Sequence, residues 1–292
     1  MKKVVFYLAY PLLWLVSKLP FPVFYLVSDF CYVIVFYLIG YRKKVVRDNL
    51  KKSFPEKSIS ELKKIEKKFY KHMCDMFLEM IKTLSISNKQ LKKRFVYKNI
   101  EELVKFEKEC NGAIVMCGHY ASYEWATAIN FYDTHNKAYA TYKKIRNKHF
   151  DKLIKDIRAN LGTTLITSKE VIPTMMRNKV NNQKASYYMI SDQSPKNTKN
   201  ACWVNFMGTE TAAFTGSESM AKKLGFGILY LQIRKVKRGY YSAKLIPLTA
   251  TPKDYQDFEI TEKFFQLLEE QIREQPEYYL WTHKRWKHTK KA

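Results

Sequence analysis

A chain of 292 residues is long enough to bury one large core, with room for a small appendage. Apolar residues make up 46% of the chain and aromatic residues 15%, which excludes a disordered protein. The 52 basic and 27 acidic side chains leave a net charge of +25, which favours acidic partners: nucleic acid, anionic lipid headgroups or an acidic carrier protein.

Residues 1–41 form an apolar segment whose only charges between Val4 and Tyr41 are Lys18 and Asp29. Residues 21–40 have the length of a bilayer span, about 20 residues, and the basic stretch YRKKVVRDNLKK favours the cytoplasmic side. We predict a membrane anchor here, as a single span, a re-entrant hairpin or an interfacial helix. A buried helical hairpin is the alternative. A cleaved signal peptide is disfavoured, because no small-residue cleavage site follows.

Residues 42–98 are expected to contain a basic linker and an amphipathic helix. Residues 42–57 are polar and include Pro55, which predicts the linker. Ser58 begins a helix, and Glu61 occupies the position of a capping box. Apolar residues then recur every three or four positions as far as Leu84, while the other face is rich in lysine.

Residues 99–292 alternate between strand-like and helix-like patterns. The expected strands are residues 113–116, 137–142, 163–166, 185–190, 227–233 and 241–246, and the expected helices are residues 125–129, 150–161, 171–179, 216–224 and 260–275. Such alternation predicts an α/β domain with a mostly parallel or mixed central sheet flanked by helices.

The five cysteines are odd in number and scattered, with no CxxC pair and no metal-ligand spacing. We expect reduced thiols in a protein that faces the cytosol, with no metal site.

Two polar clusters follow predicted strands, where open α/β sheets gather ligands. They are CGHYASYE, residues 117–124, and SDQSPKN, residues 191–197. In the first, Gly118 permits a sharp turn. Ser122 is placed as an N-cap, so Glu124 falls in the first helical turn and can fold back towards His119.

His119 and Glu124 suit proton transfer from a hydroxyl. An imidazole can take the proton, and a carboxylate behind it fixes the tautomer, as in a hydrolase triad whose nucleophilic oxygen comes from the substrate. The alternatives are two unconnected polar residues, or a Cys117 thiolate activated by His119. Spacing alone does not choose among them.

Several stretches together carry a resemblance to a known family. They are RKKVVRDNLKKSFPE, GHYASYEWA, YKKIRNKHFDKLIKDIRANLGTTLI, the Asp-Gln region MISDQSPKNTKNACWVNFMGTE and the C-terminal PEYYLWTHKRWK. They resemble the bacterial lipid A biosynthesis acyltransferases, the LpxL/LpxM-like lauroyl and myristoyl transferases of the lysophospholipid and glycerolipid acyltransferase group, and GHYASYEWA resembles their HX4E signature. The resemblance covers nearly the whole chain.

This resemblance implies transfer of a fatty acyl chain from acyl-acyl carrier protein, or acyl-coenzyme A, to a hydroxyl of a membrane lipid such as a lipid A precursor. It implies no cofactor, and a catalytic domain on the cytoplasmic face of the bacterial inner membrane. His119 would be the general base and Glu124 its orienting partner. An oxyanion would be stabilised by backbone N–H groups around Gly118 to Ala121 or by a cationic side chain.

The resemblance also implies a set of substrate-binding residues: Lys143, Arg158, Asp192, Gln193 and Arg285. Arg285 would bind phosphate or anchor the C-terminus. Where the family commonly has Arg-Pro, this chain has Lys143-Lys144, which keeps charge but loses a bidentate grip on phosphate.

Three other functions remain open: an acyltransferase for another polar lipid, such as an aminolipid, glycolipid or lysophospholipid, a non-catalytic lipid- or carrier-binding membrane protein, and a nucleic-acid binder. We expect no nucleic-acid partner, because the lysines are spread over several helices and the apolar N-terminus would have no role.

Overall fold

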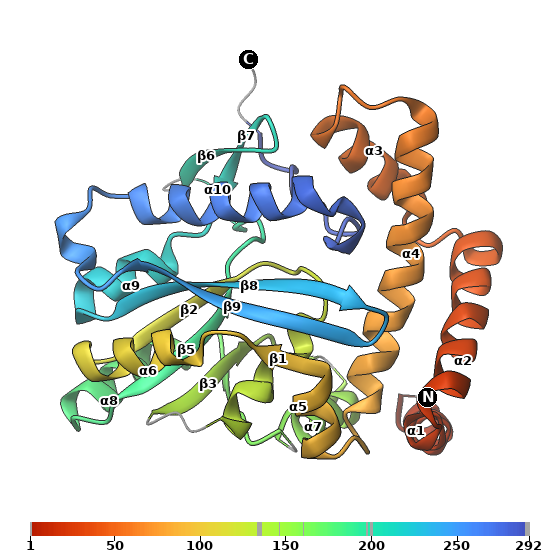
Figure 1. Ribbon diagram of the computed structural model, residues 1–292, viewed down its shortest axis with the longest axis horizontal. Helices are drawn as coiled ribbons and strands as arrows, with labels where there is room; N and C mark the ends of the chain where they lie inside the picture. The colour runs from red at the N-terminus through yellow and green to blue at the C-terminus, as the bar shows by residue number, and fades with distance from the viewer. Residues whose placement is uncertain are drawn as a thin grey trace.

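The structure is a computed structural model that describes residues 2–132, 136–145, 147–159, 161–196, 198 and 201–289. Its centre is one seven-stranded sheet (Figure 1). In spatial order the strands are β1 (Phe95–Tyr97), β9 (Tyr240–Thr249), β8 (Gly227–Lys237), β2 (Ala113–Cys117), β5 (Ala185–Ile190), β3 (Lys137–Tyr142) and β4 (Thr164–Thr167). Only the β8–β9 pair is antiparallel among these neighbours, so the sheet is mixed, as predicted.

Helices flank this sheet, and a small two-stranded ribbon lies near the C-terminus (Figure 1). The helices are α5 (Asn88–Arg94), α6 (Ile100–Glu109), α7 (Lys148–Ala159), α8 (Val171–Val180), α9 (Gly216–Leu224) and α10 (Glu259–Glu274), with the 3-10 helices η2 (Tyr123–Phe131), η3 (Pro252–Asp254) and η4 (Pro276–Tyr278). The ribbon pairs β6 (Cys202–Phe206) with β7 (Thr209–Ala213). Each helix and strand expected after Lys98 is present, with ends shifted by a few residues.

The core is centred on β2, whose five residues from Ala113 to Cys117 are all buried. Parallel strands that are covered on both faces read as continuous apolar runs, which is why this strand was visible in the sequence. Because β2 lies between β8 and β5, the loop that follows it emerges at the middle of the sheet edge.

The N-terminal region is entirely helical: α1 (Lys2–Lys18), α2 (Phe21–Val33), the π-helix η1 (Ile34–Ile39), α3 (Lys43–Ser53) and α4 (Ile59–Lys82). Ser58 and Glu61 form the predicted capping box at the start of α4. In Figure 1, α4 stands at the end of the β8–β9 hairpin, and α2 lies beside it on the side away from the sheet.

The predicted linker over residues 42–57 is wrong, because helix α3 occupies most of it. Val46 and Leu50 are buried on one face of α3, and the Asn49 side-chain amide donates to the carbonyl oxygens of Trp281 and His283, each at 2.8 Å. The lysine-rich composition hid this helix, because its apolar face is narrow and the partners of Asn49 lie more than 200 residues away in the chain.

Candidate active site

The candidate site lies where β2, β5 and β3 end. The loop after β2 carries His119, and two backbone hydrogen bonds tie it to the C-terminal segment: Ala121 N to Tyr278 O at 2.9 Å and Leu280 N to His119 O at 3.1 Å. At Gly118 a Cβ atom would lie 2.6 Å from Leu268 Cδ1 of α10, so only glycine lets the loop pass this helix. The loop is therefore held from both sides.

His119 is paired with Asp192, the second residue after β5. Its Nδ1 atom lies 2.6 Å from Asp192 Oδ1, and its backbone N–H donates to Asp192 Oδ2 at 3.1 Å. The two side chains are 13% and 3% exposed, so water competes little with this pair. An Nδ1–H group that donates to the carboxylate leaves Nε2 with the free lone pair.

Glu124 does not occupy the position that the sequence predicted for it. Its carboxylate accepts two hydrogen bonds from the Arg158 guanidinium, at 2.9 Å from Nε and 2.6 Å from Nη2. The expected orienting contact from Glu124 to His119 is thus replaced by the Asp192 contact. A bidentate guanidinium is the strongest partner within reach of Glu124, and it fixes the carboxylate on α7.

The charges around His119 favour its protonated form. Burial by itself lowers the pKa of His119, but the charge of Asp192, the hydrogen bond to it and the charge of Glu124 raise the pKa above its usual 6.5. Conversely, although burial opposes ionisation, contact with His119 holds the pKa of Asp192 below its usual value of 3.8. The site thus contains a fixed carboxylate and an imidazole made more basic by it.

His119 is among the residues that line a cavity of about 400 Å³. The Gln193 side-chain amide lies beside it, with Nε2 of Gln193 at 3.2 Å from Nε2 of His119. Arg158 and Glu124 form part of the wall, and the exposed Lys143 side chain lies at the rim.

A second, mainly apolar pocket of about 50 Å³ lies next to this cavity, between η2 and the sheet. Small side chains line it, among them Ala126, Ala138 and Ala140. Tyr123 and Arg158 line both spaces, so the pocket and the larger cavity share part of one wall.

Arg285 is fully buried and does not line the cavity. Its Nη1 atom donates to Thr211 Oγ1 at 3.1 Å and to the carbonyl oxygen of Ala212 at 3.0 Å, and its guanidinium lies against the rings of Phe206 and Phe265. In the structure Arg285 anchors the C-terminal segment to β7, while its expected role in phosphate binding stays a prediction.

Two further expectations about the loop need correction. The backbone N–H groups of His119, Tyr120 and Ala121 already donate to Asp192, Gly118 and Tyr278, so these three are not free for an oxyanion. Ser122 precedes η2, but its side chain makes no capping hydrogen bond. A left-handed Ala121, with φ of 50°, directs the loop into the 3-10 helix instead.

Cys117 is buried at the end of β2, and burial raises the pKa of its thiol far above the usual value of 9.0. A neutral thiol is a poor nucleophile at physiological pH. We therefore expect Cys117→Ala to keep activity within about tenfold of wild type, measured as the initial rate of acyl transfer, because any loss would come from packing alone. A loss as large as that from changing His119 would instead make Cys117 the nucleophile.

The sequence pattern by itself missed the pairing of His119 with Asp192 and the role of residues 278–280 in holding the loop. Asp192 and Gln193 were visible only as a polar pair after a predicted strand. Because β2 and β5 are adjacent and parallel, their following residues meet at one edge, and this adjacency was the signal that could have paired them. Among the residues that the structure describes, no three His, Cys, Asp or Glu side chains gather as a metal site.

An α/β fold in which a carboxylate-backed histidine opens into a cavity is typical of enzymes that move protons to and from a substrate hydroxyl. The chain belongs to the bacterial lipid A biosynthesis acyltransferase family, whose family model matches residues 1–288. Membership indicates an acyltransferase that uses an acyl donor and a lipid acceptor. No curated protein matches the chain.

Proposed function

We propose that this protein transfers a fatty acyl chain from acyl-acyl carrier protein to a hydroxyl group of a lipid A precursor at the cytoplasmic face of the inner membrane. Family membership supports the reaction class. The observation that carries the mechanism is the His119 ring, which lines the cavity, is held at Nδ1 by Asp192 and meets the Gln193 amide at Nε2.

In this mechanism His119 Nε2 takes the proton of the acceptor hydroxyl as its oxygen attacks the thioester carbonyl. Asp192 keeps Nδ1 protonated and stabilises the imidazolium that forms. When the tetrahedral intermediate collapses, the C–S bond breaks and the imidazolium returns its proton to the leaving thiolate. The products are an ester and a free thiol, so no cofactor is consumed.

The oxyanion needs donors other than the occupied backbone groups of the loop. The Gln193 amide lies at hydrogen-bond distance from His119 Nε2 and is free to turn to the substrate when the hydroxyl takes its place. Arg158 contributes positive charge from the cavity wall, and Glu124 keeps its guanidinium in place. Glu124 thus acts through Arg158 rather than through the imidazole.

The two cavities suggest how the substrates divide. The apolar pocket lined by Ala126, Ala138 and Ala140 accepts part of the acyl chain, where apolar surface is removed from water. Lys143 at the rim supplies charge for an acceptor phosphate. The net charge of +25 attracts both an acidic carrier protein and anionic lipid.

The test is incubation of membranes containing the protein with isotopically labelled acyl-acyl carrier protein or acyl-coenzyme A, and a panel of lipid acceptors, followed by mass spectrometry. We expect the carrier-protein donor and a lipid A precursor to give the fastest transfer, and membranes carrying His119→Gln to transfer about 10²–10⁴-fold more slowly. Binding of both substrates without turnover would identify a non-catalytic protein. Transfer only to an aminolipid, glycolipid or lysophospholipid would overturn the proposed acceptor.

A further inference from the structure

We propose that the N-terminal helices, residues 6–41, lie in the plane of an anionic lipid bilayer and do not cross it. Residues Phe21–Ile39 pass for a membrane span by length and composition, with mean hydropathy 1.9 and 22% burial. Their contacts with the rest of the protein indicate a different arrangement. This inference concerns how the protein meets the membrane and does not depend on the reaction it catalyses.

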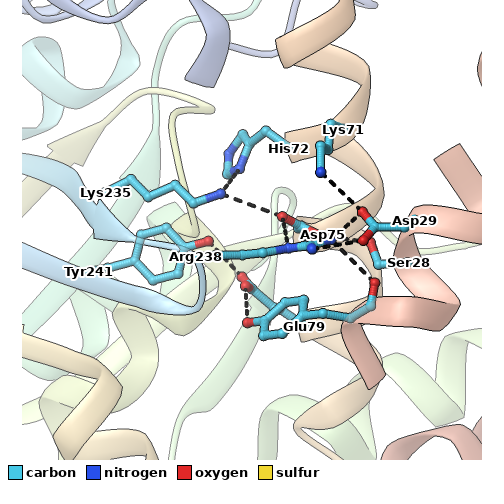
Figure 2. Close-up of polar contacts among 10 residues, drawn as sticks. Ser28, Asp29, Lys71, His72, Asp75, Glu79, Lys235, Arg238 and Tyr241 are labelled. Carbon is cyan, nitrogen blue, oxygen red and sulfur yellow. Dashed lines mark hydrogen bonds and ion pairs between the residues drawn. The ribbon is translucent and has the colours of Figure 1, made fainter. Parts of the chain in front are cut away.

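One side of α2 is fixed to the catalytic domain by polar contacts (Figure 2). Tyr25 donates to Glu79 Oε1 at 2.9 Å, and Ser28 donates to Asp75 Oδ1 at 2.7 Å. Both acceptors belong to α4 and are buried. If α2 crossed the bilayer apart from α4, Tyr25 and Ser28 would have to lose their hydrogen bonds to Glu79 and Asp75.

Asp29, midway along the apolar stretch, is held by two cations. Arg238 at the tip of the β8–β9 hairpin donates to its two carboxylate oxygens at 3.0 and 2.7 Å, and Lys71 of α4 lies 3.4 Å away. Arg238 also donates to Asp75, at 2.7 Å from Nη2, so one guanidinium joins α2, α4 and the sheet. If the middle of α2 lay at the bilayer centre, this whole cluster would lie there too.

The contacts with α4 continue along α2 and η1 as far as Tyr41. The rings of Phe36 and Tyr70 are 5.1 Å apart, and the Tyr70 hydroxyl donates to the carbonyl oxygen of Tyr41. α2 and η1 therefore run antiparallel to α4 over their whole length, and a crossing would carry α4 into the hydrocarbon. Helix α4 also exposes further lysines, which are costly there: Lys63, Lys64, Lys67 and Lys68.

The N-terminal helices also carry large apolar side chains that are exposed. On α2 and η1 they include Leu26 at 66%, Phe30 at 65% and Leu38 at 76%, and on α1 they include Leu8 at 74% and Leu12 at 62%. An exposed apolar stripe on helices that are bound on their other side is the pattern of an interfacial membrane anchor.

Charge and position favour a lipid surface as the occupant of this face. Lys18, just before α2, is exposed and can reach anionic headgroups; Arg42, just after η1, is also exposed, and its Nη1 atom donates to the carbonyl oxygen of Thr282 at 2.9 Å. Phe6 of α1 packs on His149 and Phe150 of α7, with ring centroids 5.3 and 5.4 Å apart. Since α7 forms part of the cavity wall, in-plane docking brings the cavity next to the bilayer.

The first test is topological. Lys18→Cys and Lys44→Cys, made separately in the full chain, place thiols before and after the apolar stretch and are treated with a membrane-impermeant maleimide. We expect both to be labelled in inverted membrane vesicles and neither in spheroplasts, with the unmodified chain as the background control. Labelling of the two positions from opposite sides would show a span and overturn the proposal.

The second test measures binding of the purified protein to vesicles of phosphatidylethanolamine and phosphatidylglycerol by flotation. Leu26→Glu and Phe30→Glu are each expected to weaken binding about tenfold or more, because each removes a large apolar contact and adds a charge. Val180→Glu, at an 81% exposed position on α8, is the matched control and should bind as wild type.

Folding of each variant is checked by circular dichroism, and its mass in solution by light scattering. Unchanged vesicle binding by folded Leu26→Glu and Phe30→Glu would refute the proposal. The proposal would also be refuted if the wild-type protein were a dimer and the folded variants were monomers that still bound vesicles. The exposed apolar side chains would then join two copies of the chain.

Discussion

Replacing His119 with glutamine is expected to reduce the rate of acyl transfer by about 10²–10⁴-fold. Glutamine retains polarity and can still contact Asp192, but it has no nitrogen that accepts a proton at physiological pH. The attacking hydroxyl would then have to lose its proton to water. The measurement is the initial rate of labelled product, with kcat and KM determined separately, and the loss should fall mainly on kcat.

His288→Gln provides the matched control, since His288 does not line the cavity. It should transfer acyl groups at the wild-type rate. Circular dichroism and vesicle binding of His119→Gln should equal those of the wild-type protein, while its thermal stability should fall, because the variant loses the buried contact between the imidazole and Asp192. A folded His119→Gln variant with wild-type turnover would eliminate the general-base mechanism.

The second large effect is expected from Asp192→Asn. An asparagine can present its amide to Nδ1 and so favour the tautomer with the proton on Nε2, which leaves no base facing the hydroxyl. We expect a loss in kcat of about 10²–10⁴-fold, by analogy with the effect of this change in hydrolase triads.

The pH profile of kcat/KM gives a test specific to orientation and charge. A general base must be neutral, so activity is lost as pH falls through its pKa. The charge of Asp192 raises the pKa of His119, and burial lowers it. In wild type the acidic limb should therefore lie above pH 6.5, and in Asp192→Asn the limb should move to lower pH.

Glu124→Gln is the comparison that separates the two carboxylates. The Glu124 carboxylate is bound to Arg158 and contributes less than Asp192 to the pKa of His119. The acidic limb of the Glu124→Gln profile should therefore move less than that of the Asp192→Asn profile. If Glu124→Gln moved the limb further than Asp192→Asn, the pairing of His119 with Asp192 would not be the one that operates in catalysis.

Much of the α/β domain could be predicted from residue patterns. The continuous apolar run at Ala113–Met116, the alternation at Lys137–Tyr142 and the glycine that follows Leu224 each identify a local structure correctly. Burial periodicity and turn residues act over a few positions, so they are readable in one sequence. The same reasoning placed both polar clusters at the edge of the sheet where they are found.

Local patterns also failed where a segment depends on remote contacts. Residues 43–53 look like a solvated basic linker. In the structure, however, the Asn49 side chain donates to the carbonyl oxygen of Trp281 in the C-terminal segment, and two apolar residues give α3 its buried face. Likewise, the ion pairs of Asp29 with Arg238 and Lys71 join the N-terminal apolar stretch to distant parts of the chain, and no local pattern indicated them.

By itself the sequence determined that this protein has an α/β domain, an apolar N-terminal segment and a histidine at the end of a buried strand. The tertiary structure alone decided which carboxylate meets that histidine. Glu124 is five positions away in the chain, but η2 turns it towards Arg158, whereas Asp192 is 73 positions away and arrives on the adjacent parallel strand. Sequence spacing fixes only the direction of a side chain on its own element, and the order of strands in the sheet determines which distant side chains come within hydrogen-bond distance.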